Sequence, residues 1–267
     1  MLFPIFLRLV DNMENQLVIL TCTVRTKMTT GMKRFEEDIR REDYVKAIRA
    51  WSKLSEELGF RILVAENSNS LESLKSNLVS INNPRLEFVQ TQEDQISHIE
   101  GNSAGEFKIL KEILDMGLIP EYVDMVWKVT GRLYVRNFQE IVPPNKPDFV
   151  VNRFYSPRHL IDTRVIGFSK KSYQTLFSQD PKFISGNHSS PIQNRGTYSS
   201  FEHLATVEIL HSEIGNGIVK TMTKVPIFTG YSATSNKQID GALSRFKKRV
   251  TNYFRPIIVK LLVGSTP

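Results

Sequence analysis

Short apolar runs alternate with segments of helical periodicity through the first hundred residues of the chain. Residues 16–23 (QLVILTCT) and 61–65 (RILVA) are too apolar for half-exposed strands, so they predict strands buried on both faces. Between them, the apolar residues of 43–59 recur at helical spacing, and Gly59 is a typical helix stop. The series continues with a short helix predicted at 70–78 and a third strand at 86–90. This order with tight connections predicts a parallel, right-handed unit.

The later part of the chain repeats the alternation. Its predicted elements are a helix at 101–114, two extended runs within 126–137, strands at 148–154 and 162–168, and helices at 170–177 and 201–214. Two stretches, 180–198 and 226–241, are predicted loops. The order predicts an α/β fold with a mostly parallel, Rossmann-like central sheet flanked by helices. We expect one domain over 16–241, preceded by an extension over 1–15 and followed by a basic amphipathic helix over 242–267.

Composition narrows the class of partner. The 267 residues carry a net charge of +7 with a sequence pI of about 9.4, which favours anionic partners such as nucleotides, phosphates, nucleic acid or an acidic membrane face. The single cysteine, Cys22, excludes an internal disulfide framework, and its apolar surroundings are typical of a buried small hydrophobe. No apolar run reaches about 18 residues, so no transmembrane span is expected. Residues 1–10 lack the cleavage pattern of a signal peptide.

Polar side chains follow the first two predicted strands where each strand ends. Thr23 and Arg25 follow the first strand, and Glu66, Asn67 and Ser68 follow the second. The carboxyl ends of parallel strands are where ligands collect, and a carboxylate there can accept hydrogen bonds from a ribose or a base. The alternative is a capping cluster for the next helix, because Asn and Ser are good N-cap residues.

The helix predicted at 101–114 begins with the sequence GNSAGE, which contains Gly105. A small, glycine-containing helix start exposes amides and a positive dipole end to a phosphate or a sugar. It is neither a Walker loop nor a dinucleotide fingerprint, because the Gly-Lys-Ser/Thr and the glycine spacing are absent. Helix capping alone is the competing explanation.

The central stretch 126–137 (VWKVTGRLYVRN) places two cations and a glycine between strong strand formers. Lys128 and Arg132 can hold negative oxygens, while Gly131 allows a turn or a close approach to a ligand. This stretch predicts the floor of a nucleotide-sugar site. The alternative is a buried strand with a kink and two solvated cations.

These stretches together resemble a GT-A type nucleotide-sugar glycosyltransferase of the kind that builds bacterial surface polysaccharides such as capsule and O-antigen. The likeness spans about residues 16–235 and rests on the order of its motifs, each of which is weak alone. It implies donor binding by residues of the strand ends, of the helix start and of the central stretch: Thr23, Arg25, Glu66, Asn67, Ser68, Gly105, Lys128, Thr130, Gly131 and Arg132. Phe201-Glu202-His203-Leu204 resembles the late acidic helix start that supplies the base in inverting members.

The resemblance therefore implies Glu202 as the general base, with Asp162 as the second choice. Each has a structural alternative. Glu202 can be a first-turn acid stabilised by the helix dipole, and Asp162 can be a strand-edge residue paired with Arg164.

The chain departs from that family at one point. It has no Asp-x-Asp pair to bind a divalent metal at the expected strand, where Lys128-Val129-Thr130-Gly131-Arg132 stands instead. Because a departing nucleotide needs its charge stabilised by a metal or by fixed cations, we expect transfer without a metal cofactor. Further cations that can help are Arg164, Lys170, His188 and Arg195. A monophosphate-linked donor such as a CMP-sugar also fits such a site.

The expected partners are a nucleotide-sugar donor and a glycan or lipid-linked acceptor. The basic amphipathic pattern of 242–263 is typical of contact with an anionic membrane, and equally of a helix packed on the core with a solvated basic face. The expected location is the cytoplasm, with peripheral contact at the inner face of the membrane.

Three other classes of protein compete with the transferase. A nucleic-acid-binding protein is disfavoured because the basic residues are dispersed and no known module appears. A polysaccharide-binding or scaffold protein needs no base. Another nucleotide-using transferase, such as a nucleotidyltransferase, normally needs carboxylate pairs for Mg²⁺.

Overall fold

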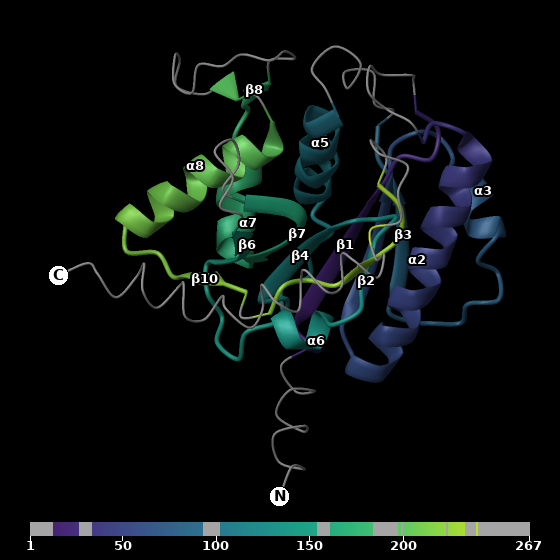
Figure 1. Ribbon diagram of the computed structural model, residues 1–267, viewed down its shortest axis with the longest axis horizontal. Coiled ribbons are helices and arrows are strands. Elements are labelled where there is room, and N and C mark those ends of the chain that lie inside the picture. The colour runs from purple at the N-terminus through teal and green to yellow at the C-terminus, as the bar shows by residue number, and fades with distance from the viewer. Residues whose placement is uncertain are drawn as a thin grey trace, which may run out of the picture.

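The computed structural model describes residues 13–26, 34–92, 102–153, 161–183, 197–198, 200–222, 224–232 and 239. A seven-stranded sheet runs through the centre of this part of the chain (Figure 1), in the strand order β10-β6-β7-β4-β1-β2-β3. The strands are β1 (Gln16–Cys22), β2 (Arg61–Glu66), β3 (Leu86–Gln90), β4 (Met125–Thr130), β6 (Phe149–Arg153), β7 (Ile161–Ser169) and β10 (Val219–Thr221). Only β7 runs antiparallel to its neighbours within this sheet. The predicted α/β class with a mostly parallel central sheet is confirmed.

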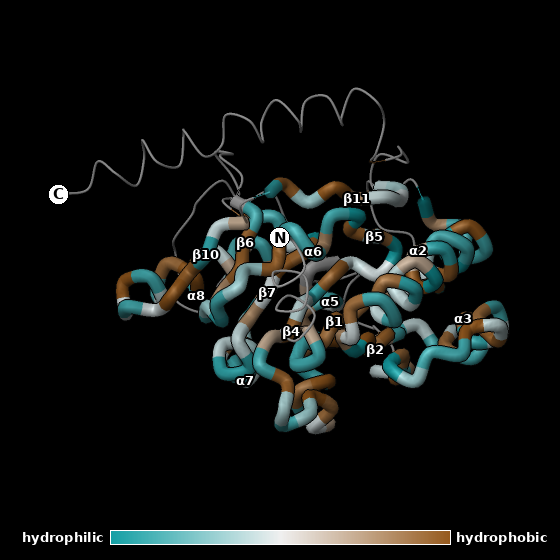
Figure 2. Tube along the Cα trace, turned by 90° about the horizontal axis from the view of Figure 1, so that it is seen from below, coloured by the Kyte–Doolittle hydropathy of each residue, from teal (hydrophilic) through white to brown (hydrophobic). Residues whose placement is uncertain are grey.

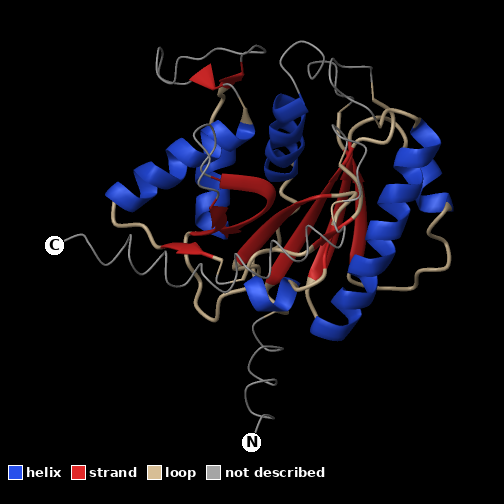
Figure 3. Ribbon diagram, viewed as in Figure 1, coloured by secondary structure: helices blue, strands red, loops and turns tan. Residues whose placement is uncertain are grey.

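Helices cover both faces of the sheet (Figure 3). One face carries α2 (Glu37–Leu58), α3 (Leu71–Ser76) and α6 (Phe138–Ile141). The other carries α5 (Asn102–Asp115), α7 (Lys170–Phe177) and α8 (Phe201–Ile214). Burial on both faces of the sheet explains why β1 is largely apolar. Val18 and Leu20 pack in the core on the α2 side, while Leu17 and Ile19 pack in the core on the α5 side. Figure 2 shows the hydrophilic positions that recur along the outer helices α2 and α3.

Several predicted boundaries agree with the structure to the residue. β3, α7 and α8 have the predicted limits, and α2 ends at Leu58 with Gly59 in the left-handed conformation (φ 86°). α2 nevertheless begins at Glu37, six residues before the prediction, because its first turns are polar. Here the helix extends beyond its apolar stripe.

The two predicted loops contain short strands. β8 (Lys182–Phe183) pairs with β9 (Thr197–Tyr198), and β11 (Phe228–Thr229) pairs with β5 (Tyr134–Val135). Pairs of two residues lie below the length at which alternation can be recognised in a sequence.

Some predictions lie outside the described residues. These are the extension over 1–12, the membrane-contacting helix over 242–263, and the candidates His188 and Arg195. The division into an extension, a domain and a C-terminal helix therefore stays a prediction. In the portion of the chain that the structure describes, no helix is both long and apolar enough to cross a membrane.

Candidate functional site

The strand order creates a switch point between β1 and β4. The chain runs outward from β1 through β2 to β3, and then returns to the other side of β1 as β4. Crossovers on opposite sides leave a crevice beyond the carboxyl ends of these two strands, which is where ligands bind in open α/β sheets. Thr21 and Thr130 are neighbours at that edge, because they are paired in the register of β1 and β4.

Lys128 lies at this edge and is the centre of a polar network that we call the Lys128 network (Thr21, Glu106, Lys128, Thr163 and Glu202). The Lys128 Nζ atom is 2.7 Å from Glu106 Oε1 and donates to the carbonyl oxygen of Thr163 at 2.6 Å. The Thr21 hydroxyl donates to the same oxygen of Glu106 at 2.9 Å. The Thr163 hydroxyl donates to Glu202 Oε1 at 2.8 Å. The network thus joins β1, α5, β4, β7 and the first turn of α8.

The central side chain of this network, that of Lys128, is fully buried. The Lys128 side chain is 0 % exposed, whereas that of Glu106 is 21 % exposed. A buried ammonium loses its hydration, so its charge depends on Glu106 and on the Thr163 carbonyl. The aromatic ring of Phe201 is 5.7 Å from Lys128 Nζ and adds a cation–π contact. The competing expectation of a solvated Lys128 is therefore wrong.

The two carboxylates of the network are each held by one oxygen only. Glu106 uses Oε1 for Thr21 and Lys128, and Glu202 uses Oε1 for Thr163. The Oε2 atoms of both have no hydrogen-bond partner within the described ranges. Each carboxylate is thus oriented and still has an oxygen that can accept a proton or a hydrogen bond.

Three members of the network, Thr21, Glu106 and Thr163, were missed by sequence reasoning. Glu106 belongs to the GNSAGE helix start. The prediction there concerned the backbone amides and not the carboxylate of Glu106. Thr163 is an ordinary strand former in an apolar strand. The neighbouring candidate Gly105 lies in the first turns of α5, one residue before Glu106.

The polar tips of β1 and β2 also converge, as predicted. The Thr23 hydroxyl donates to Asn67 Oδ1 at 2.6 Å, and the Arg25 amide donates to Ser68 Oγ at 2.9 Å. Glu66 is 0 % exposed, and both of its oxygens accept from the protein. Its donors are the Val24, Ser68 and Ser70 amides and the Ser68 hydroxyl. The structure therefore gives Glu66 an internal role, and donor contact by this residue stays a prediction.

Gly131 permits a close approach to β1. Its amide donates to the Thr21 carbonyl at 2.9 Å. A Cβ atom at this position would lie 2.6 Å from both Cys22 Sγ and the Thr21 carbonyl oxygen. Only glycine fits without a shift of the backbone. The glycine thus joins two strands, and the next residue, Arg132, lies beside the switch point.

Arg132 is half-buried, and its Nε atom donates to the Tyr231 carbonyl at 3.2 Å. Within the residues that the structure covers, its two terminal nitrogens have no hydrogen-bond partner. A guanidinium whose outer nitrogens are available can bind a phosphate through two parallel hydrogen bonds.

The remaining predicted cations have other partners. Arg164 forms a bidentate pair with Asp162, at 2.8 Å from Nε and 2.7 Å from a terminal nitrogen. Asp162 is thus paired with Arg164, as expected if its role is structural. Lys170 lies at the opposite edge of the sheet, because the antiparallel β7 pairs Ser169 with Met125 at the start of β4. There it contacts Glu121 at 2.9 Å, so the structure does not bring it to the Lys128 network.

Cys22 is buried at the end of β1, at the carboxyl edge of the sheet. Burial, together with the nearby charge of Glu66, raises the pKa of its thiol well above the ordinary value. A thiol with a raised pKa is a poor nucleophile, which agrees with the interpretation of Cys22 as a small hydrophobe.

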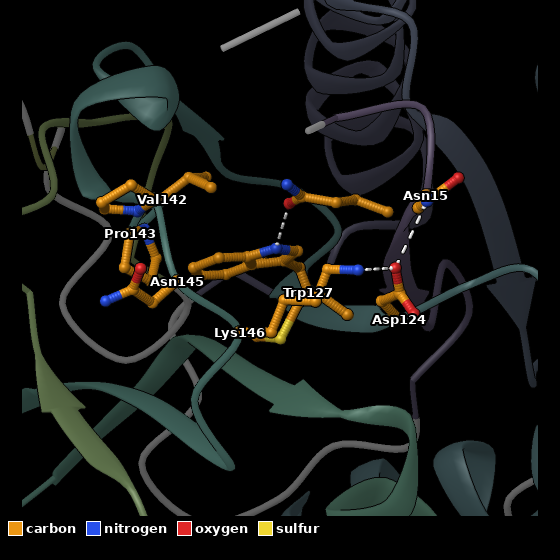
Figure 4. A pocket seen from close by; sticks show the side chains of 10 residues that line it. Asn15, Asp124, Trp127, Val142, Pro143, Asn145 and Lys146 are labelled. Carbon is orange, nitrogen blue, oxygen red and sulfur yellow. Dashed lines mark hydrogen bonds and ion pairs between the residues drawn. The ribbon is translucent and has the colours of Figure 1, made fainter. Parts of the chain in front are cut away.

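A small hollow lies at the amino edge of the sheet, lined by residues that include Trp127, Asp124 and Lys146 (Figure 4). Trp127 forms its floor and donates from Nε1 to Gln16 Oε1 at 2.7 Å. At its rim, Asp124 contacts Lys146 and accepts from Asn15. These residues satisfy one another across the start of β1 and β4, so the hollow is separate from the carboxyl edge.

Among the described residues, the carboxyl edge offers no cluster of ligands for a divalent metal. The Asp-x-Asp pair of the family that the chain resembles is replaced by Lys128 and Thr130. An ion bound by Glu106 would lie beside the ammonium of Lys128, 2.7 Å from the same carboxylate, and the two cations would repel each other in a poorly hydrated site. In the described part of the chain, no three or more His, Cys, Asp or Glu residues gather as potential ligands.

No protein-family model and no curated protein matches this sequence. Solved structures do match in shape. One is the 4-diphosphocytidyl-2C-methyl-D-erythritol synthase from Anaerococcus prevotii, with 12% identity and a TM-score of 0.46, covering 92% of this chain and 98% of that chain. Another is the galactosyltransferase LgtC, with 9% identity and a TM-score of 0.45, covering 77% and 72%. A glycosyltransferase that modifies the major capsid of PBCV-1 has 10% identity and a TM-score of 0.43, covering 78% and 83%.

These structural neighbours are nucleotide-sugar transferases and nucleotidyltransferases. At identities near 10% and TM-scores below 0.5, they do not determine the reaction of this chain.

Proposed function

We propose that the chain is a glycosyltransferase that moves a sugar from a nucleotide-sugar donor to a glycan or lipid-linked acceptor, as in surface-polysaccharide synthesis. The observation that carries the proposal is the Lys128 network at the switch point between β1 and β4. Buried charges are expensive to maintain unless they are paired, and polar groups that converge in a crevice are candidates for a functional site. Here they lie where a parallel sheet binds ligands.

Glu202 is the proposed general base. The Thr163 hydroxyl fixes Oε1 at 2.8 Å, which leaves Oε2 to accept the proton of the acceptor hydroxyl. The acceptor oxygen then forms a bond to the anomeric carbon of the donor sugar, while the bond from that carbon to the phosphate oxygen breaks. The electron pair of the broken bond leaves with the nucleotide, and the proton remains on Glu202.

Arg132 is the proposed partner of the departing phosphate. Its two terminal nitrogens can stabilise the charge that develops on the leaving oxygen. Lys128 supplies a fixed cation beneath the site, because Glu106 and the Thr163 carbonyl hold its ammonium in place. We infer that transfer proceeds with these fixed cations in place of a divalent metal.

Binding of nucleotides to the intact protein tests the proposal first. Thermal stability is measured with UDP, GDP, CMP, CDP, TDP and ATP, each in EDTA and in Mn²⁺. A ligand that binds only the native state raises its apparent stability, by about 2.7 kcal/mol at a hundredfold excess over Kd. We expect one nucleotide to stabilise the protein equally in both conditions. Stabilisation in Mn²⁺ alone would overturn the metal-free site, and no stabilisation at millimolar concentration would favour a scaffold or polysaccharide-binding protein.

Product analysis separates the glycosyltransferase from a nucleotidyltransferase. The protein is incubated with the matching nucleotide-sugars and acceptor glycans, and separately with nucleoside triphosphates and sugar 1-phosphates. A glycosyltransferase releases the nucleotide from the first mixture, whereas a nucleotidyltransferase releases pyrophosphate from the second. Pyrophosphate release without nucleotide release would refute the proposed reaction.

A further inference from the structure

Side chains of α2, of β2 and of the loop after β2 fix the backbone of residues 23–25, directly after β1. The Thr23 amide donates to the Tyr44 hydroxyl at 3.0 Å. The Val24 amide donates to Glu66 at 3.2 Å, as described above for the tips of β1 and β2. On the other side, Arg40 Nε donates to the carbonyl oxygens of Thr23 at 3.0 Å and Val24 at 3.2 Å. The polar groups of this segment, which no strand or helix pairs, are therefore held by side chains.

Arg40 holds the segment in an unusual way for a charged residue. It is 3 % exposed, and its partners are carbonyl oxygens and the Tyr44 hydroxyl. Among the described residues, no carboxylate lies within ion-pair distance of it. Glu66 likewise has only amide and hydroxyl donors. A positive and a negative buried charge thus hold the two sides of one segment, where packed apolar side chains would be less costly.

Arg40 also joins both ends of the connection between β1 and α2. Its NH1 atom donates to the Arg34 carbonyl at 3.2 Å, while its other nitrogens bind Thr23 and Val24. Arg34 is in turn paired with Asp43, on the same face of α2 as Arg40 and Tyr44. The buried side of α2 therefore holds the described residues on both sides of 27–33.

We propose that Arg40 is a positioning residue that preorganises residues 23–25 for the nucleotide of the donor. The inference rests on the proposed function, because it assumes that a nucleotide binds at the carboxyl edge of β1. Arg40 is buried behind the segment and acts through the backbone that it holds, without touching the donor. A segment whose backbone is already held in place loses less conformational entropy when the ligand binds, so preorganisation of residues 23–25 strengthens binding.

The test compares Arg40→Met and Arg40→Lys with Tyr44→Phe and with the control Arg49→Met. Arg49 lies on the same helix, and its side chain also donates to a carbonyl, that of Asn77, at 2.9 Å. Calorimetry with the nucleotide that stabilises the wild type gives Kd, and steady-state kinetics gives KM and kcat. Hydrogen exchange at the Val24 and Arg25 amides, without nucleotide, reports the order of the segment directly. Tyr44→Phe is the milder variant should Arg40→Met fail to fold.

We expect Arg40→Met to raise Kd and KM about tenfold with kcat nearly unchanged, and to speed exchange at Val24 and Arg25. Arg40→Lys should recover part of the affinity, Tyr44→Phe should weaken binding less, and Arg49→Met should match the wild type. A merely structural role would lower the melting temperature of folded variants and leave Kd unchanged. Folded Arg40 and Tyr44 variants with wild-type Kd would overturn this inference alone, whereas a wild type that binds no nucleotide would overturn the proposed function with it.

Discussion

Two regions at the carboxyl edge of the sheet bury charge in opposite ways. Between β1 and β2, Glu66 is surrounded by donors, and both of its oxygens accept from backbone amides. Between β1 and β4, Glu106 and Glu202 each use one oxygen and leave the other without a partner in the described residues. A carboxylate whose two oxygens both accept hydrogen bonds, which we call saturated, stabilises the structure through those bonds. It is closed to a ligand, because any new partner must displace an existing one. A carboxylate that is held by one oxygen is oriented and still free to react.

The comparison predicts that substitutions in the two regions change different kinetic constants. Changes near β4 should lower kcat, because they remove groups that we propose to act on the reacting atoms. Changes near β2 should lower stability and raise KM, because they loosen the segment that we propose as part of the donor site.

The largest expected effect is that of Glu202→Gln. The amide keeps the size of the side chain and its bond to Thr163, but it cannot accept the proton of the acceptor. We expect kcat to fall by about 10²–10⁴-fold, with little change in the affinity for the nucleotide. The measurement is initial rates of nucleotide release at saturating donor, with Glu208→Gln on the same helix as the control. Wild-type rates in Glu202→Gln would remove Glu202 from the chemistry and favour a protein without a base.

The next effect concerns stability. Glu106→Leu leaves the ammonium of Lys128 buried without its carboxylate, and we expect a loss of about 3–5 kcal/mol in the free energy of unfolding. The double variant Lys128→Met/Glu106→Leu should recover a large part of that loss, since it removes both charges. Urea denaturation of the wild type, Glu106→Leu, Lys128→Met and the double variant measures the coupling free energy between the two side chains.

An exposed ion pair is the control for that cycle. Glu42 and Lys46 lie four residues apart on α2 and are exposed, so their coupling should be close to zero. If the buried pair showed no more coupling than this one, Lys128 would owe its charge to groups other than Glu106.

A smaller effect is expected from Glu66→Gln. The substituted amide points an N–H group at donors such as the Ser68 and Ser70 amides, which lose an acceptor. We expect a loss of about 1–3 kcal/mol in stability, together with a higher KM and an unchanged kcat. Thermal denaturation and steady-state kinetics on the same preparation measure both. A fall in kcat with unchanged KM would mean that Glu66 acts in the chemistry. A carboxylate whose two oxygens both accept hydrogen bonds would then not necessarily be structural.

Local patterns allowed much of the fold to be predicted from the sequence. β3, α7 and α8 were placed to the residue, because the limits of an apolar run or stripe are local. The meeting of the Thr23 and Glu66 tips followed from parallel neighbouring strands. Lys170 was misplaced because β7 is antiparallel, and strand direction depends on the whole sheet.

The partners within the site were beyond prediction for a different reason. Thr21 and Glu106 are 85 residues apart in sequence, and Thr163 and Glu202 are 39 apart. Which side chains meet over such distances depends on helix rotation and side-chain rotamers, which no local pattern encodes. For the same reason, the sequence could not distinguish the saturated Glu66 from the open Glu106.

Cys22 lies between the two regions and gives the smallest expected effect. Its Sγ atom packs beside Gly131, and Glu66 contributes to the raised pKa of the thiol. Because the folded state raises this pKa, the neutral thiol contributes stability below the ordinary thiol pKa of 9.0, and that contribution is lost as the pH rises above it. We expect the native thiol to resist a disulfide reagent near neutral pH and to react fully once the protein is unfolded in urea. Fast labelling of the native protein would show that the strands β1 and β4 open at the switch point, and the two regions would then not be separate rigid parts of one edge.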